Sequence, residues 1–194
     1  GYSGTVPDAR QPTQTPVSSG LPQPAGTAGA ERRPGIVLGG RFLIRELLGE
    51  GGSGTVYAAL DTTVGQKVAV KVLRPELADE PNRERLRREV RAAHPGHPNI
   101  VTVFDLHQHD GLLFLSMELV VGRSLGEVLA ERRTLPVDDV VTIGARVATA
   151  LANLHGRGLV HRDLKPGNVL RGTDGSVKLC DLGPARPLAR AGTS

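Results

Sequence analysis

The sequence predicts an α+β fold of two lobes, in which a five-stranded antiparallel sheet with one helix precedes a mainly helical lobe. Short apolar runs separated by turn residues fill the first half, which is the pattern of strands. In the second half, apolar residues recur at helical spacing after Pro136. A chain of 194 residues has the length of one such domain, or of part of a larger one.

The first 40 residues differ in composition from the rest of the chain. They hold 6 of the 14 prolines and 8 of the 25 glycines, and their apolar residues are few and aperiodic. Such a segment buries too little surface to offset the entropy lost on ordering. We therefore expect residues 1–39 to form a disordered tail that serves as a linker, or alternatively as a docking or phosphorylation segment through its Ser and Thr residues.

Five strands and one helix are expected in the first lobe. The helix is expected over residues 81–93, because Pro81 suits a first helical turn, Leu86, Val90 and Ala93 share a face, and Pro95 ends the pattern. Glycines or polar turn residues bound each apolar run. The runs that predict strands cover residues 42–48, 55–58, 67–73, 100–106 and 112–119, and the polar residues 107–111 are expected to connect the last two.

The second lobe is expected to be mainly helical. Ser124 and Glu127 have the spacing of a capping box, which predicts a short helix to about Arg132. A longer helix is expected from Pro136 to about Gly156, with Asp138 and Asp139 well placed in its first turn. Its apolar face is expected to consist of Val140, Ile143, Val147, Leu151 and Leu154. Two short strands, near residues 169–170 and 177–180, are expected to flank a turn at 172–175.

Charge and composition exclude several classes of protein. The net charge of +4 is small and comes without a clustered basic face, so we expect no binding to nucleic acid. Cys180 is the single cysteine, which excludes an internal disulfide framework and a Cys-rich zinc site. No run of about 18 apolar residues is present, so we expect no membrane segment within this chain. The first residues also lack the pattern of a signal peptide.

Residues 49–56 have the form G-x-G-x-x-G-x-V. Glycines allow a backbone to approach a phosphate closely and to expose its N–H groups. A plain glycine-rich hairpin would have the same residues, so the motif alone is weak. A dinucleotide fingerprint needs a helix after the loop, whereas here a strand is expected on each side. The context therefore favours a phosphate-covering loop of another kind.

Lys71 ends an apolar strand run, 17 residues after the last glycine of the loop. A lysine in this position is usually only a charge at a strand edge. Glu89, on the expected helix, lies between Leu86 and Val90 and is the natural partner to hold Lys71 in place. Glu84 is an alternative partner.

The segment His161-Arg162-Asp163-Leu164-Lys165-Pro166-Gly167-Asn168 is the strongest signal. It places an acid, a lysine two residues later and an asparagine five residues later in one loop after a helix. A carboxylate can accept a hydroxyl proton, an ammonium can neutralise a transferring phosphate, and an amide oxygen can coordinate a metal. Asp181-Leu182-Gly183 then follows a strand, and a carboxylate there suits a hard cation such as Mg²⁺.

These motifs, in this order, resemble a eukaryotic-type protein serine/threonine kinase of the kind found in bacteria. The resemblance covers residues 41–194, with 40–120 as the first lobe and 121–194 as part of the second lobe, through the catalytic loop and the start of the activation segment. Lys165 between Asp163 and Asn168 resembles the Ser/Thr class. Leu182 replaces the family's Phe, and no A-P-E motif occurs before Ser194.

The resemblance implies transfer of the ATP γ-phosphate to Ser or Thr hydroxyls of protein substrates. It implies that Asp163 accepts the hydroxyl proton and that Lys165 steadies the phosphoryl group. It implies that Lys71, held by Glu89, binds the α and β phosphates. A cytoplasmic location is expected, with tethering to a membrane by sequence beyond Ser194 as an alternative, and the oligomeric state is left open.

ATP and Mg²⁺ are the cofactors that the resemblance implies. Asn168 and Asp181 match the family's magnesium ligands. The backbone near Met117 resembles the hinge that meets adenine. The residues expected around the nucleotide are Leu48, Gly49, Glu50, Gly51, Gly52, Ser53, Gly54, Thr55, Val56, Ala69, Lys71, Glu118, Val120 and Leu170.

Three alternatives remain at this point. A pseudokinase would bind ATP as a regulatory module, although Lys71, Asp163 and Asp181 are all present. A small-molecule phosphotransferase of related fold is the second alternative. The third is an inactive, truncated fragment, because the helices that complete the family's second lobe would follow Ser194.

Overall fold

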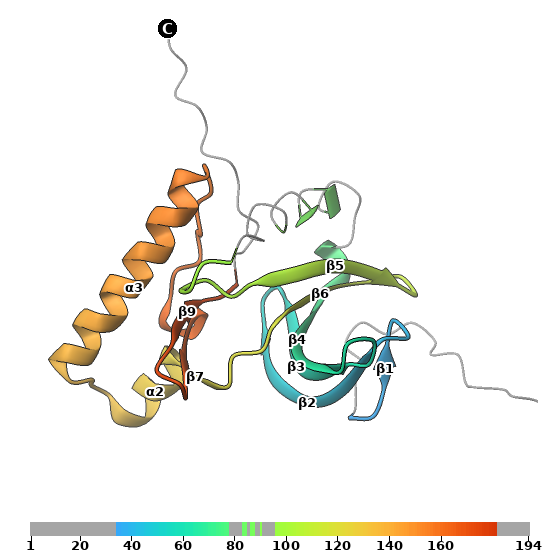
Figure 1. Cartoon of the computed structure of the whole chain (residues 1–194), viewed down its shortest axis with the longest axis horizontal. Helices are drawn as coiled ribbons and strands as arrows, with labels where there is room; N and C mark the ends of the chain where they lie inside the picture. The colour runs from blue at the N-terminus through green and yellow to red at the C-terminus, as the bar shows by residue number, and fades with distance from the viewer. Residues whose placement is uncertain (1–33, 78–82, 85, 88–89, 91–95, 182–194) are drawn as a thin grey trace, which may run out of the picture. The chain divides into compact units, whose positions relative to one another are not determined.

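The computed structural model describes residues 34–77, 83–84, 86–87, 90 and 96–181 (Figure 1). Residues 1–33 of the tail predicted over 1–39 lie outside this description, as do Leu182, Gly183 and the rest of the chain to Ser194. Pro81, Glu89 and Ala93 of the predicted helix also lie outside it, whereas residues 83, 84, 86, 87 and 90 are helical.

A six-stranded antiparallel sheet forms the first half, with the strand order β1-β2-β3-β4-β6-β5. Apolar residues on one face of the sheet make a core that includes Phe42, Ile44, Val70 and Phe114, each at most 1% exposed. The bounds are β1 Val37–Leu38, β2 Phe42–Gly51, β3 Gly54–Asp61, β4 Gln66–Leu73, β5 Val103–His109 and β6 Leu112–Glu118, with the short 3₁₀ helix η1 at Pro75–Leu77.

The sheet has six strands and not the predicted five, because β1 lies within the segment assigned to the tail. Val37 pairs with Leu43 and Leu38 with Phe42, and the Leu38 side chain is 2% exposed in the core. A strand of two residues shows no alternation along the sequence. Gly35 and Gly39 flank this strand and have positive φ angles, which glycine adopts readily. In the sequence, these glycines only added to the linker-like composition of the tail.

The hairpin between β5 and β6 is also tighter than predicted. Its turn consists of Asp110 and Gly111, with φ of 49° and 75°, which is the type of two-residue turn that fits the twist of paired strands. The predicted connection at residues 107–111 was therefore too long, since β5 continues to His109. The predicted start of this strand at Ile100 was too early, because Ile100 forms an isolated bridge with Leu179 instead.

Over residues 96–181, the second half contains the α-helices α2 and α3 and a small sheet of order β7-β8-β9 (Figure 1). Ser124 caps the first helix with the full capping box, so this prediction is confirmed. The sequence did not predict β7, the third strand of the small sheet. The bounds are β7 Gly122–Ser124, α2 Leu125–Arg132, α3 Val137–Gly156, η2 Pro166–Asn168, β8 Val169–Gly172 and β9 Val177–Leu179.

Helix α3 packs against β9 and supplies the core of this half. Ile143 and Leu154 are 7% and 1% exposed, and Val147 and Leu151 pack against them. Val140 is 53% exposed, so the predicted apolar face is wrong at its first turn. Among the described residues, the structure contains no helix with the length and apolar character needed to cross a membrane.

Gly54 offers a matched test of backbone packing. A Cβ atom built on Gly54 would lie 2.1 Å from the carbonyl oxygen of Val72, whereas one on Gly52 would meet nothing within 4 Å. We expect Gly54→Ala to lower the free energy of unfolding by roughly 1–3 kcal/mol, as strained backbone positions do. Gly52→Ala should leave it nearly unchanged. Thermal unfolding of both variants checks this, and equal melting temperatures would contradict it.

Candidate active site

The glycine-rich loop turns at Gly52 and Ser53, between the end of β2 at Gly51 and the start of β3 at Gly54. A strand therefore follows the loop, as the sequence predicted, and this excludes the strand–loop–helix arrangement of a dinucleotide fingerprint. Gly54 is buried against β4, while Gly52 is exposed. The tip of the loop is thus free to approach a ligand while its base is fixed in the sheet.

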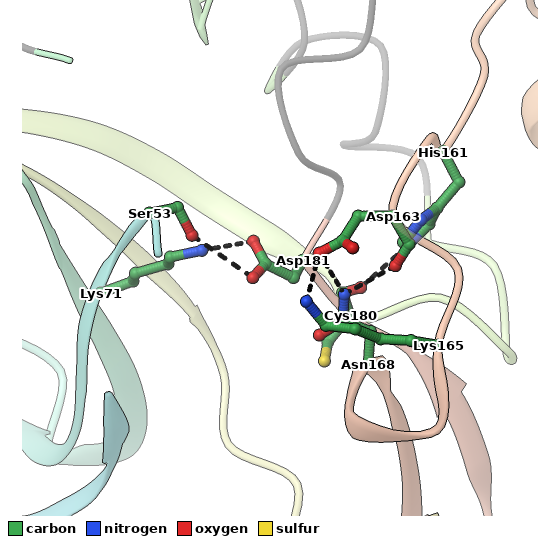
Figure 2. Close-up of polar contacts among 8 residues, drawn as sticks. All are labelled: Ser53, Lys71, His161, Asp163, Lys165, Asn168, Cys180 and Asp181. Carbon is green, nitrogen blue, oxygen red and sulfur yellow. Dashed lines mark hydrogen bonds and ion pairs between the residues drawn. The ribbon is translucent and has the colours of Figure 1, made fainter. Parts of the chain in front are cut away.

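Lys71 is 7% exposed on β4, and its ammonium forms an ion pair with the carboxylate of Asp181 (Figure 2). The Ser53 hydroxyl donates a second hydrogen bond to Asp181, with 3.4 Å from Oγ to Oδ2. Glu89, the predicted partner of Lys71, lies outside the described residues. The structure therefore brings together Ser53 of the glycine-rich loop, Lys71 of β4 and Asp181, which lies more than 100 residues later in the sequence.

Asp163 accepts two side-chain hydrogen bonds in the loop that follows α3 (Figure 2). Lys165 Nζ lies 2.7 Å from its Oδ2, and Asn168 Nδ2 lies 3.0 Å from the same atom. The hydrogen bond from Lys165, followed by the one from Asn168, holds the pKa of Asp163 below its ordinary value. Asp163 is therefore an ionised carboxylate at neutral pH, able to accept a hydrogen bond from a hydroxyl.

Asn168 is 6% exposed and also donates to the carbonyl oxygen of Asp163, at 2.7 Å. Asp163 thus occupies the donor atom Nδ2 of Asn168, and the amide oxygen Oδ1 can act only as an acceptor or a metal ligand. Asn168 Oδ1 and the Asp181 carboxylate are hard oxygen donors of the kind that Mg²⁺ uses when substrate phosphates complete its shell. The residues present therefore fit the metal that the sequence suggested.

His161 joins this loop to the segment that follows β9, directly before Asp181. The imidazole is 2% exposed, and its Nε2 atom lies 3.0 Å from the carbonyl oxygen of Cys180. A carbonyl oxygen only accepts, so Nε2 carries the hydrogen. The backbone N–H of Cys180 in turn donates to the carbonyl oxygen of Asn168, at 2.9 Å. Two contacts thus fix the loop that carries Asp163 against the end of β9.

Two residues of the site have left-handed backbone. The φ angle is 65° at Arg162 and 55° at Asp181, and residues other than glycine rarely adopt such positive values. Such conformations persist where the surrounding structure holds them, and they cluster at functional sites. In this site the surrounding contacts are the Asp163 hydrogen bonds and the Lys71–Asp181 ion pair.

The residues predicted around the base occupy the neighbouring strands. Ala69 is 5% exposed on β4 and stands opposite Met117 in the register of β4 and β6. Val56 on β3 and Leu170 on β8 are half-buried, and Leu48 is 46% exposed on β2. The contact of these side chains with a nucleotide stays a prediction.

Cys180 has a free, partly buried thiol. Burial, with the nearby Asp181 carboxylate as a smaller cause, raises its pKa to about 11 from an ordinary 9.0. A rise of about two pKa units leaves about 100-fold less thiolate at neutral pH, and the thiolate is the reactive form of the side chain.

We therefore expect Cys180 in the native protein to react with iodoacetamide about 100-fold more slowly at pH 7 than in the unfolded chain. The rate in the native protein should still be rising near pH 11, where the thiol ionises. Mass spectrometry of timed samples measures both rates. Fast native labelling that levels off below pH 9 would show that the thiol is not held in this way.

One pair near the site was missed. The Lys178 ammonium lies 2.8 Å from Glu118 Oε1 and 3.0 Å from Oε2, joining β9 to the end of β6. The available signal was Lys178 itself, a charged residue between Val177 and Leu179, which are 4% and 0% exposed. A lysine between two buried residues of a short strand is itself partly buried, and a partly buried charge is favoured when an opposite charge lies nearby.

The chain is similar in sequence and in fold to known proteins. The model of the protein kinase domain matches residues 42–193. The chain is 45% identical over 156 residues to serine/threonine-protein kinase PksC of Streptomyces coelicolor, covering 75% of this chain and 28% of that protein. It is 40% identical over 157 residues to probable serine/threonine-protein kinase PknB of Corynebacterium glutamicum, covering 78% and 24%.

Among solved structures, the PknI kinase domain of Mycobacterium tuberculosis is similar with a TM-score of 0.70 and 35% identity. That match covers 80% of this chain and 64% of the PknI chain. The chain spans about a quarter of the length of the curated relatives it matches.

Proposed function

Because the chain belongs to the protein kinase domain family, we propose that the protein containing it transfers the γ-phosphate of ATP to Ser or Thr hydroxyls of other proteins. The observation that carries this proposal is the Asp163 carboxylate, which is ionised and bound by both Lys165 and Asn168. The relatives are named as serine/threonine-protein kinases. We place the reaction in the cytoplasm, where ATP is available.

Each residue of the site has a step that its chemistry suits. Asp163 orients the substrate hydroxyl by accepting its hydrogen bond and then takes its proton as the oxygen attacks phosphorus. Lys165, beside Asp163 and exposed, balances negative charge on the phosphoryl group in transit. Lys71 binds phosphate oxygens of ATP from β4, and the glycine-rich loop covers them.

Asn168 and Asp181 would hold Mg²⁺, which neutralises charge on the phosphate oxygens when it is bound. Asp181 can do so only after part of its present contact with Lys71 is exchanged for the metal and phosphate. Glu89 as the partner of Lys71 in that exchanged state remains a prediction. The pseudokinase alternative is disfavoured, since Lys71, Asp163 and Asp181 all lie in one site.

The test is a phosphorylation assay with the full-length protein and labelled ATP. A generic protein such as casein or myelin basic protein should be labelled on Ser and Thr, whereas small alcohols and aminoglycosides should not be. The Asp163→Asn variant serves as the control for contaminating kinases. Labelling of small molecules alone would favour the phosphotransferase alternative, and binding of ATP without any labelling would favour the pseudokinase.

A further inference from the structure

Glu118, at the end of β6, is held by two other segments of the chain. Its backbone N–H donates to the carbonyl oxygen of Thr102 at 2.9 Å, and its Oε2 atom accepts from the Thr102 N–H at 3.2 Å. Its carboxylate also pairs with Lys178, at 2.8 Å. The end of β6 is thus fixed through both its backbone and its side chain.

Lys178 lies on β9, three residues before Asp181. Side chains alternate across a strand, so the burial of Val177 and Leu179 in the core directs Lys178 to the opposite face. Its side chain is 16% exposed and that of Glu118 is 30% exposed. The pair is therefore partly buried, so each charge depends on the other more than in a fully exposed ion pair.

The segment before β5 is bound to the same strand. Leu179 N–H donates to the carbonyl oxygen of Asn99 at 2.8 Å, and Val101 N–H donates to that of Leu179 at 2.9 Å. Asn99 Nδ2 donates to the carbonyl oxygen of Val177 at 3.0 Å. Strand β9 is therefore fixed along its length, and the Glu118–Lys178 pair is its side-chain link to the end of β6.

We propose that the Glu118–Lys178 ion pair is a positioning contact that couples the adenine-binding hinge to the magnesium ligand Asp181. The pair joins the last residue of β6 to the strand that ends just before Asp181. A shift of β9 relative to β6 moves the Asp181 carboxylate with respect to a nucleotide anchored at the hinge. Lys178 thus acts through Asp181 and touches no substrate. This inference rests on the proposed function.

The experiment compares two ligands of the full-length protein by calorimetry. Adenosine reports on the hinge alone, whereas a non-hydrolysable ATP analogue with Mg²⁺ reports on the hinge and on Asp181 together. Lys178→Met should raise the Kd of the magnesium–nucleotide complex about five- to tenfold, as for a coupling between two sites, and leave that of adenosine within about twofold. Lys67→Met is the matched control, because Lys67 is an exposed lysine at the start of β4.

A double-mutant cycle with Glu118→Gln separates the pair from a general loss of stability. In the Glu118→Gln background, Lys178→Met should have little further effect on the Kd of the magnesium–nucleotide complex. Lys178→Arg, which keeps the charge, should restore most of the wild-type affinity. Melting temperatures of all variants show that each is folded, and Lys178→Gln replaces Lys178→Met if the latter is not.

The outcomes are distinct. If the wild-type protein binds neither ligand, the proposed function is wrong. If it binds both, and Lys178→Met leaves both affinities unchanged or weakens both equally, the positioning role is wrong and the pair is only structural. Additive effects of Lys178→Met and Glu118→Gln on the Kd of the magnesium–nucleotide complex would also contradict the proposed coupling. Selective, non-additive weakening of the magnesium complex supports it.

Discussion

The Asp163→Asn variant of the full-length protein should lose a factor on the order of 10² to 10⁴ in kcat, the usual contribution of a positioned general base. The amide cannot take a proton from the substrate hydroxyl, and it loses the charge that Lys165 now balances at 2.7 Å. The Kd of the magnesium–ATP complex should change little, because Asp163 acts on the hydroxyl. Steady-state kinetics and nucleotide binding measure the two effects separately.

A Leu164→Ala variant is the matched control for Asp163→Asn, since Leu164 is the next residue of the same loop and is 50% exposed. It should remain within a few-fold of wild-type kcat. The assigned role of Asp163 would be wrong if Asp163→Asn kept wild-type turnover. A loss of nucleotide affinity as large as the loss of kcat would also contradict it, because the residue would then act in binding.

Lys71→Met should cost on the order of 10² to 10³ in kcat/KM, by analogy with the removal of other electrostatic stabilisers. Lys71 is 7% exposed and is the ammonium paired with Asp181. Its loss removes a charge that positions phosphate and leaves the Asp181 carboxylate without its ion-pair partner. Phosphorylation kinetics at saturating and limiting ATP measure the effect.

Lys67→Met again provides the comparison, because it removes a lysine from the same strand at an exposed position. It should behave as the wild type in the phosphorylation assay. If Lys71→Met and Lys67→Met were equally active, the charge of Lys71 would have no part in catalysis. A melting temperature close to that of the wild type is required for the comparison to count.

Local signals predicted most of the fold. The capping box of Ser124 and Glu127 fixes the start of α2 through contacts three residues apart, so the sequence alone specified it. The match to the PknI kinase domain confirms the expected two-lobed fold. Strand β1 was missed because Leu38 owes its conformation to a long-range position in the core and not to its neighbours.

The site was predictable to a similar extent. Asp163, Lys165 and Asn168 lie within six residues, and the structure joins all three as the motif suggested. The ion pair of Lys71 with Asp181 spans 110 residues, and that of Glu118 with Lys178 spans 60, so neither follows from local pattern. Glu89, the partner predicted for Lys71 on the nearest expected helix, lies outside the described residues and stays a prediction. Side-chain pairing across a fold depends on the assembled geometry, which no single segment contains.

The left-handed backbone of Arg162 has a consequence for how mutations there are interpreted. A β-branched side chain at φ of 65° collides with its own backbone, whereas Asn or Gly adopts that angle readily. The residues accepted at position 162 should therefore depend first on whether they adopt a positive φ angle, and only then on their charge. Arg162→Val would alter the path of the chain into Asp163 and inactivate the protein for a conformational reason, while Arg162→Asn would remove the charge alone. Saturation mutagenesis of position 162 should thus show a pattern of accepted residues that follows backbone preference and not polarity.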